Sequence, residues 1–312
     1  MIMILILVTS ALLRIVVAAA LLAAVAGITA CGGSGSDGGQ TIAATTGITA
    51  DLAERVAGPD ADVEQIVPDS ASPHDYELSA QDRQKLEEAD VVVANGAGLE
   101  AAIPLDEVDA PSWMLTDHAG ELSPFEEGGD DPHVWMDPTR VAEALPSLAD
   151  VLADTDPDHA DEYRRRAREY ERELRTLDRE LAGRLTGVPA RDRELVTSHD
   201  SLAYFADRYQ FDVAATAFPA TGAEAEASAE QIQAVEDAVR KSGVPAIFAQ
   251  EGDDPETLRL VGEETGVEVE YGLLVESPSS AGSYEEMLRR DAELIANSLR
   301  AGRRPALLAR ER

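Results

Sequence analysis

Three histidines of this 312-residue chain stand where a metal ligand would be useful: His74, His133 and His199. His74 and His199 lie at or just beyond the ends of predicted strands, and ligands of open α/β sheets bind outside the carboxyl ends of the strands. Prolines precede His74 and His133 and restrict the local backbone to a fixed loop. Such a loop suits Zn(II), which needs an imidazole nitrogen at about 2.0–2.1 Å. Position alone leaves a surface or supporting role open for each histidine.

The other two histidines have ordinary surroundings. His118 stands in a polar loop, and His159 opens a charged helical segment, where we expect it to be exposed. The chain contains no H-E-x-x-H sequence, the helical zinc motif of many metalloproteases.

The elements that must position these residues follow a repeating pattern. Short apolar, β-branched runs predict strands at residues 41–45, 63–67, 91–94, 113–115, 194–197, 213–217, 246–249 and 267–275. Amphipathic stretches between them, such as 49–57 and 79–88, predict helices. Strands that alternate with helices indicate βαβ units and a parallel sheet. Because the pattern stops and restarts, we expect an α/β fold with two similar lobes.

A long charged segment, Asp158–Leu185, separates the two sets of strands. Its apolar residues recur every three or four positions and form one stripe of a helix about 40 Å long. They are Tyr163, Ala167, Tyr170, Leu174, Leu177 and Leu181. We expect this helix to join the lobes and to pack along both, and a coiled-coil dimer is the alternative. A last helix is predicted to open at Ser283, with Glu286 completing a capping box.

The composition excludes several classes of protein. The formal net charge is −34, which argues against a nucleic-acid partner. The single cysteine, Cys31, rules out an internal disulfide and a cysteine-based zinc site. Lys241-Ser242 lacks the upstream glycines of a phosphate-binding loop, so we expect no ATP hydrolysis by this chain.

The first 40 residues read as a targeting segment. Residues 1–30 are predicted to be a signal peptide, because the apolar run after Arg14 is too short to span a bilayer. The run ends in ITAC, which resembles the lipobox of bacterial lipoproteins and implies a lipid on Cys31. An ordinary signal anchor with a chance cysteine is the alternative. The glycine- and serine-rich stretch that completes residues 31–40 is predicted to be a flexible tether.

Four phrases occur in an order that is specific to one family. They are PHDYE at 73–77, NGAGLE at 95–100, DPHVWMDP at 131–138, and TSHD at 197–200 followed by YFA at 204–206. Together they resemble the zinc- and manganese-binding lipoproteins of ABC importers, the cluster A-I solute-binding proteins, from about Ile42 to Leu299. The resemblance implies two α/β lobes joined by one long rigid helix, with the metal in the cleft between them.

The resemblance also implies the ligands. His74 and His133 match ligands of the first lobe, and His199 matches a ligand of the second. The fourth ligand of the family is usually an aspartate, and this chain has Glu276 at that position. Monodentate and bidentate coordination by the Glu276 carboxylate both stay open. Three imidazoles and one carboxylate favour Zn(II), with Mn(II) as the second possibility. We expect affinity to fall below about pH 6.5, since the ligands must be deprotonated.

The sequence therefore predicts an exported, lipid-anchored, monomeric protein that captures a metal and delivers it to an ABC permease with a separate ATPase subunit. The expected lobes are residues 41–155 and 188–302, with the linker helix at 156–187 and a basic tail at 303–312. We expect no enzymatic activity. A cell-surface zinc hydrolase and a non-metal adhesin or scaffold are the alternatives. The acidic loop 121–131 includes Glu126, Glu127, Asp130 and Asp131. It could collect cations weakly or be only surface charge, and we favour surface charge.

Overall fold

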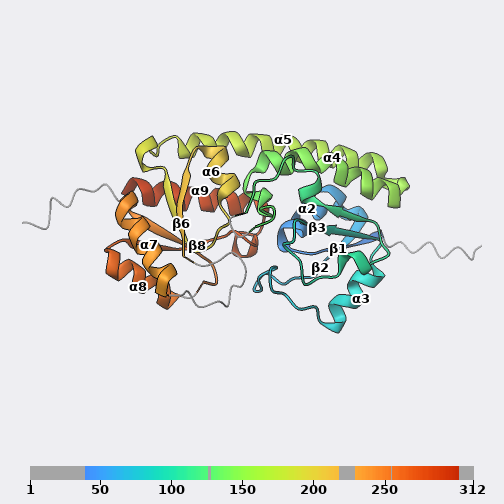
Figure 1. Cartoon of the computed structure of the whole chain (residues 1–312). Helices are drawn as coiled ribbons and strands as arrows, with labels where there is room; N and C mark the ends of the chain where they lie inside the picture. Colours follow the sequence, from blue (N-terminus) through green and yellow to red (C-terminus); the bar gives the residue numbers. More distant parts are fainter. Residues whose placement is uncertain (1–38, 126–127, 218–228, 254, 302–312) are drawn as a thin grey trace, which may run out of the picture. The chain divides into compact units, whose positions relative to one another are not determined.

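The computed structural model describes residues 39–125, 128–217, 229–253 and 255–301. Gln40–Arg312 forms one compact unit (Figure 1). The predicted signal peptide, Cys31, the tether before Gly39, Glu126, Glu127 and the basic tail lie outside the described residues. Within the described ranges, no helix is both long and apolar enough to cross a membrane.

The first lobe is built on a four-stranded parallel sheet with the order β2-β1-β3-β4. Its strands are β1 (Gln40–Ala44), β2 (Ala61–Gln65), β3 (Val91–Ala94) and β4 (Ser112–Met114). Helices α2 (Gly47–Ala57) and α3 (Ala80–Glu88) connect them. Side chains of Thr46 and Ser79 form capping boxes that begin these two helices.

The second lobe repeats this plan with the strand order β6-β5-β7-β8, again all parallel. Its strands are β5 (Glu194–Thr197), β6 (Asp212–Thr216), β7 (Ala246–Gln250) and β8 (Glu268–Leu273). Its helices are α6 (Ala203–Tyr209), α7 (Ala229–Ser242), α8 (Pro255–Thr265) and α9 (Tyr284–Ala301). The predicted strands are all present, with ends that differ by at most two residues, and the α/β prediction with two parallel-sheet lobes is confirmed.

Helix α5 (Ala160–Leu185) is the long helix that the charged segment predicts. Its apolar stripe is fully covered by its own chain, because α5 packs against α2, α4 and α9. The stripe is therefore not available for the coiled-coil dimer that we kept as an alternative. One continuous apolar core includes residues of both sheets and of α5, so the two lobes share a core.

Helix α4 (Pro138–Thr155) is a major element that the sequence analysis does not include. Asp137 caps it by accepting hydrogen bonds from the backbone N–H and the hydroxyl of Thr139 at 2.8 and 2.7 Å. The helix buries one face and packs extensively along α5 (Figure 1). The long helix thus has a partner over much of its length, and the DPHVWMDP phrase leads directly into that partner.

Candidate metal centre

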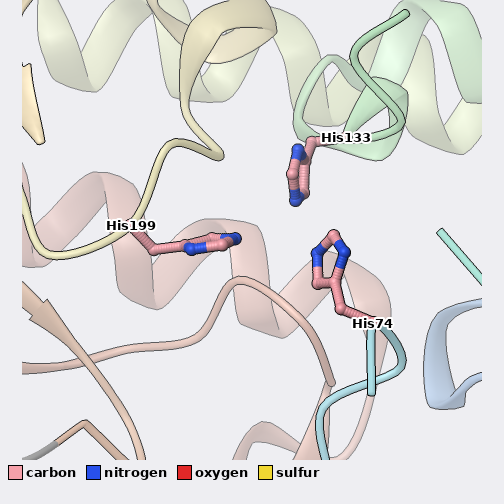
Figure 2. A group of neighbouring side chains, drawn as sticks. All are labelled: His74, His133 and His199. Atoms are coloured by element: carbon pink, nitrogen blue, oxygen red, sulfur yellow. The ribbon is translucent and has the colours of Figure 1, made fainter. Parts of the chain in front are cut away.

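The structure brings three of the predicted ligands together. The imidazole centroids of His74, His133 and His199 lie 5.5–5.6 Å apart in all three pairs. One nitrogen of each ring lies within 4.8 Å of one nitrogen of both others. Figure 2 shows the three rings converging on one point from three separate loops. Two of the loops belong to the first lobe and one to the second.

His133 is the most enclosed of the three, with no exposed side-chain surface. It precedes a short 3-10 turn, Val134–Met136, which leads to α4. The Asp131 carboxylate accepts hydrogen bonds from the His133 backbone N–H at 2.9 Å and pairs with its Nδ1 at 2.7 Å. The ring is therefore held on one side, with its Nε2 left to face the other two histidines.

The NGAGLE phrase supports this loop from behind. Asn95 donates from Nδ2 to the carbonyl of Pro132 at 3.0 Å. Asn95 is in turn fixed by Glu100, a buried carboxylate that accepts from the backbone of Asn95 and Gly96 at 2.7 and 3.1 Å. Thr45 at the end of β1 donates to the same carboxylate at 2.6 Å. The NGAGLE residues therefore support the His133 loop, a structural role that their sequence alone does not reveal.

His199 follows β5 and is held by the neighbouring strand β7. The backbone N–H of Ser198 donates to the Phe248 carbonyl at 2.9 Å. The Ser198 hydroxyl accepts from the backbone N–H of Gln250 at 3.1 Å. The Thr197 hydroxyl donates to the His199 carbonyl at 2.8 Å. Burial, and then the neighbouring imidazoles of His133 and His74, lower the pKa of His199 from 6.5 to about 3. His199 is thus neutral at physiological pH, as a metal ligand must be.

His74 lies in the irregular loop between β2 and α3. Its backbone N–H donates to the Ser72 hydroxyl at 3.4 Å. Further along the loop, Tyr76 donates to Asp82 in the first turn of α3 at 2.8 Å. The loop is therefore fastened on both sides of His74, and the ring is half-buried.

Glu276 lies at the edge of the histidine cluster. Its Oε1 is 3.9 Å from His199 Nε2, although it is not among the atoms that lie within 4.8 Å of one another. Burial raises the pKa of Glu276, and a hydrogen bond from Ser72 partly offsets that effect. The carboxylate therefore lies beside the imidazole cluster but is not part of it in this structure.

The donor set fits a small divalent cation. Nε2 of His133 and of His199 is buried and accepts no hydrogen bond from the described residues. Buried polar atoms of this kind are usually satisfied, so a cation is the natural partner. Tetrahedral Zn–N bonds of about 2.0–2.1 Å place nitrogens about 3.3–3.4 Å apart. The nitrogens, which lie within 4.8 Å of one another, would therefore have to approach to that distance around a zinc ion.

The remaining histidines lie elsewhere. His118 is exposed and stacks on Trp113, with ring centroids 5.8 Å apart. The side chain of His159 is 41% exposed, as the sequence predicts, and its Nδ1 also lies 2.6 Å from Asp156 Oδ2. Asp131 is a correction: it is 1% exposed rather than surface charge, since the His133 loop folds over it.

Comparisons with known proteins place this chain among relatives that are named for metal binding. Residues 42–298 match the family described as "Zinc-uptake complex component A periplasmic", ZnuA. The manganese-binding lipoprotein MntA of Halalkalibacterium halodurans is 28% identical over 294 residues, covering 91% of this chain and 97% of that protein. The iron-binding protein YfeA of Yersinia pestis is 30% identical over 245 residues, covering 76% and 78%. The structure of the periplasmic zinc-binding protein TroA from Treponema pallidum has a TM-score of 0.78 at 23% identity, covering 84% and 99%.

Two parallel-sheet lobes with convergent imidazoles between them define a class of cation-binding α/β proteins. Because the family match spans nearly all of the described residues, this chain belongs to the ZnuA family of metal-binding proteins of ABC importers. The resemblance inferred from the four phrases, from about Ile42 to Leu299, is confirmed.

Proposed function

We propose that this protein captures Zn(II) outside the cytoplasm and delivers it to an ABC permease. The observation that carries this proposal is the triangle of imidazoles, with centroids 5.5–5.6 Å apart, drawn from both lobes. His74, His133 and His199 are the proposed nitrogen ligands, and Glu276 is the proposed oxygen ligand. Metal binding would hold the lobes together and present one defined surface to the permease.

The choice of Zn(II) rests on the donor set. Nitrogen-rich four-coordinate sites suit zinc, whereas oxygen-rich sites with more ligands suit manganese. The relatives MntA and YfeA are named for manganese and iron, and the similar structure of TroA is named for zinc. Sequence similarity alone therefore does not identify the metal. Mn(II) stays the second candidate for this site.

The transport role also implies a location and partners. A signal peptide at 1–30 and a lipid on Cys31 would tether the folded unit to the outer face of the cell membrane. The permease would receive the ion, and a separate ATPase subunit would supply the energy. We propose that the protein is a monomer without enzymatic activity, since four protein ligands leave no open position for a reacting water.

The test is a metal titration of residues 40–312, purified and stripped with a chelator. We expect one Zn(II) per chain, bound tightly. The variant His199→Ala should bind at least about 10-fold more weakly, while His118→Ala should bind like the wild type. Equal binding by both variants would refute the assignment of ligands, and turnover of peptides or esters would favour a hydrolase.

Affinity alone does not identify the cargo, because most nitrogen and oxygen sites bind Zn(II) more tightly than Mn(II). X-ray absorption of the zinc-loaded protein therefore tests the four-coordinate geometry on which the choice of Zn(II) rests. We expect about four nitrogen and oxygen neighbours at about 2.0–2.1 Å for Zn(II). Six-fold oxygen-rich coordination would contradict the proposed zinc site.

A further inference from the structure

We propose that Asp131 is a positioning residue that fixes the ring and the tautomer of His133, an inference that rests on the proposed metal function. Asp131 is 1% exposed, and its Oδ1 lies 2.7 Å from His133 Nδ1 and 2.9 Å from the His133 backbone nitrogen. One oxygen atom therefore engages both the main chain and the side chain of the same ligand.

The chemistry of this contact determines which ring nitrogen is available. A carboxylate only accepts hydrogen bonds, so Nδ1 of His133 must carry the proton and donate it. The lone pair then lies on Nε2, the buried nitrogen without a hydrogen-bond partner among the described residues. Hydrogen bonds of this kind orient metal-binding histidines and raise their basicity.

The backbone of Asp131 is held by its own loop and by the second lobe. The Asp131 backbone N–H donates to the Ser123 carbonyl at 2.8 Å, and the Asp131 carbonyl accepts from the Tyr204 hydroxyl at 2.9 Å. The same hydroxyl accepts from the Ser123 backbone at 3.0 Å. Tyr204 lies on α6, and the Arg140 guanidinium covers its ring at 4.6 Å. A chain of contacts thus runs from α6 through Asp131 to the His133 ring.

The neighbouring Asp130 provides a matched control. It carries the same side chain in the same loop but is exposed. The comparison of Asp131→Ala, Asp131→Asn and Asp130→Asn therefore separates the contact with His133 from the loss of one negative charge near the site.

Two measurements on residues 40–312 test the proposal. Nitrogen NMR of the metal-free protein reports the tautomer of His133, assigned with His133→Gln. Zinc titration reports the affinity. We expect the Nδ1–H tautomer in the wild type and in Asp131→Asn, and its loss in Asp131→Ala. We expect Zn(II) to bind about 10- to 100-fold more weakly to Asp131→Ala. Asp131→Asn should lie between that variant and Asp130→Asn, which should match the wild type.

The outcomes separate this proposal from the metal function. An unchanged tautomer in Asp131→Ala, or an affinity equal to that of Asp130→Asn, would overturn the positioning role while leaving metal capture intact. If Asp131→Ala does not fold, equal zinc binding by Asp131→Asn and Asp130→Asn overturns the role instead. Absence of zinc binding by the wild type would refute the proposed function, and the tautomer would still test the contact.

Discussion

Acid should destabilise the metal-free protein through His199 in particular. This side chain is only 11% exposed, and its pKa falls from 6.5 to about 3, first through burial and then through the other two imidazoles. The variant His199→Gln keeps a polar side chain of similar size but removes the ionisable group. The difference between the two proteins therefore isolates the cost of keeping this imidazole neutral.

The sign follows from proton binding. Between about pH 3 and pH 6.5 the unfolded chain binds a proton at His199 and the folded chain does not, so the free energy of unfolding falls as the pH falls. With pKa values of 6.5 and about 3, the loss at pH 5 is about 2 kcal/mol.

Chemical denaturation measures this loss. Residues 40–312 in excess chelator would be unfolded with urea at pH 7.5 and at pH 5. We expect the wild type to lose about 2 kcal/mol more than His199→Gln over this interval. His118→Gln, which alters an exposed histidine, should lose as much as the wild type. Equal losses in the wild type and His199→Gln would refute the argument that burial suppresses the charge.

The low pKa also revises one expectation from the sequence. Proton competition at a free imidazole would weaken metal binding below about pH 6.5. For His199 the burial of the ring moves that competition to lower pH, toward about 3. Zinc binding that is retained near pH 5 would therefore be consistent with His199 as a ligand.

Two further substitutions test the supports of the site. Gly96 has a φ of +87°, and a Cβ there would lie 2.4 Å from the Thr116 hydroxyl, whereas one at Gly98 (φ +79°) meets nothing within 4 Å. Urea unfolding should therefore show Gly96→Ala to be about 1–3 kcal/mol less stable than Gly98→Ala, and equal stabilities would contradict the clash. Trp135 donates from Nε1 to the Val275 carbonyl at 2.7 Å, and Trp135→Phe should lower the unfolding free energy by about 1–3 kcal/mol in the same assay.

The strands were predictable because each is a short apolar run bounded by polar or turn residues. Val91–Ala94 and Glu194–Thr197 are found with the predicted bounds. Helix α4 was harder to recognise, because Pro146 interrupts a segment that is otherwise amphipathic. In the structure Pro146 lies on the exposed side of that helix.

The site was predictable only in part. Loop positions and prolines marked His74, His133 and His199, but the long intervals between them contain no periodicity that brings them together, so the family phrases were needed. Asp131 was misread as surface charge because one acidic residue in an acidic loop carries no sign of its partner. The signal available was its place two residues before His133, a spacing that allows a side chain to bond to the backbone ahead of it.

The surroundings of Glu276 bear on whether its carboxylate would bind a metal through one oxygen or through both. The Ser72 hydroxyl accepts the His74 backbone N–H at 3.4 Å, and a hydrogen bond from Ser72 lowers the pKa of Glu276, so Ser72 contacts proposed ligands of both lobes. A carboxylate has two oxygens, and Oε1 of Glu276 is the one that lies 3.9 Å from His199 Nε2. We therefore expect Glu276 to bind a metal through one oxygen, which together with three imidazoles would give the tetrahedron that Zn(II) prefers.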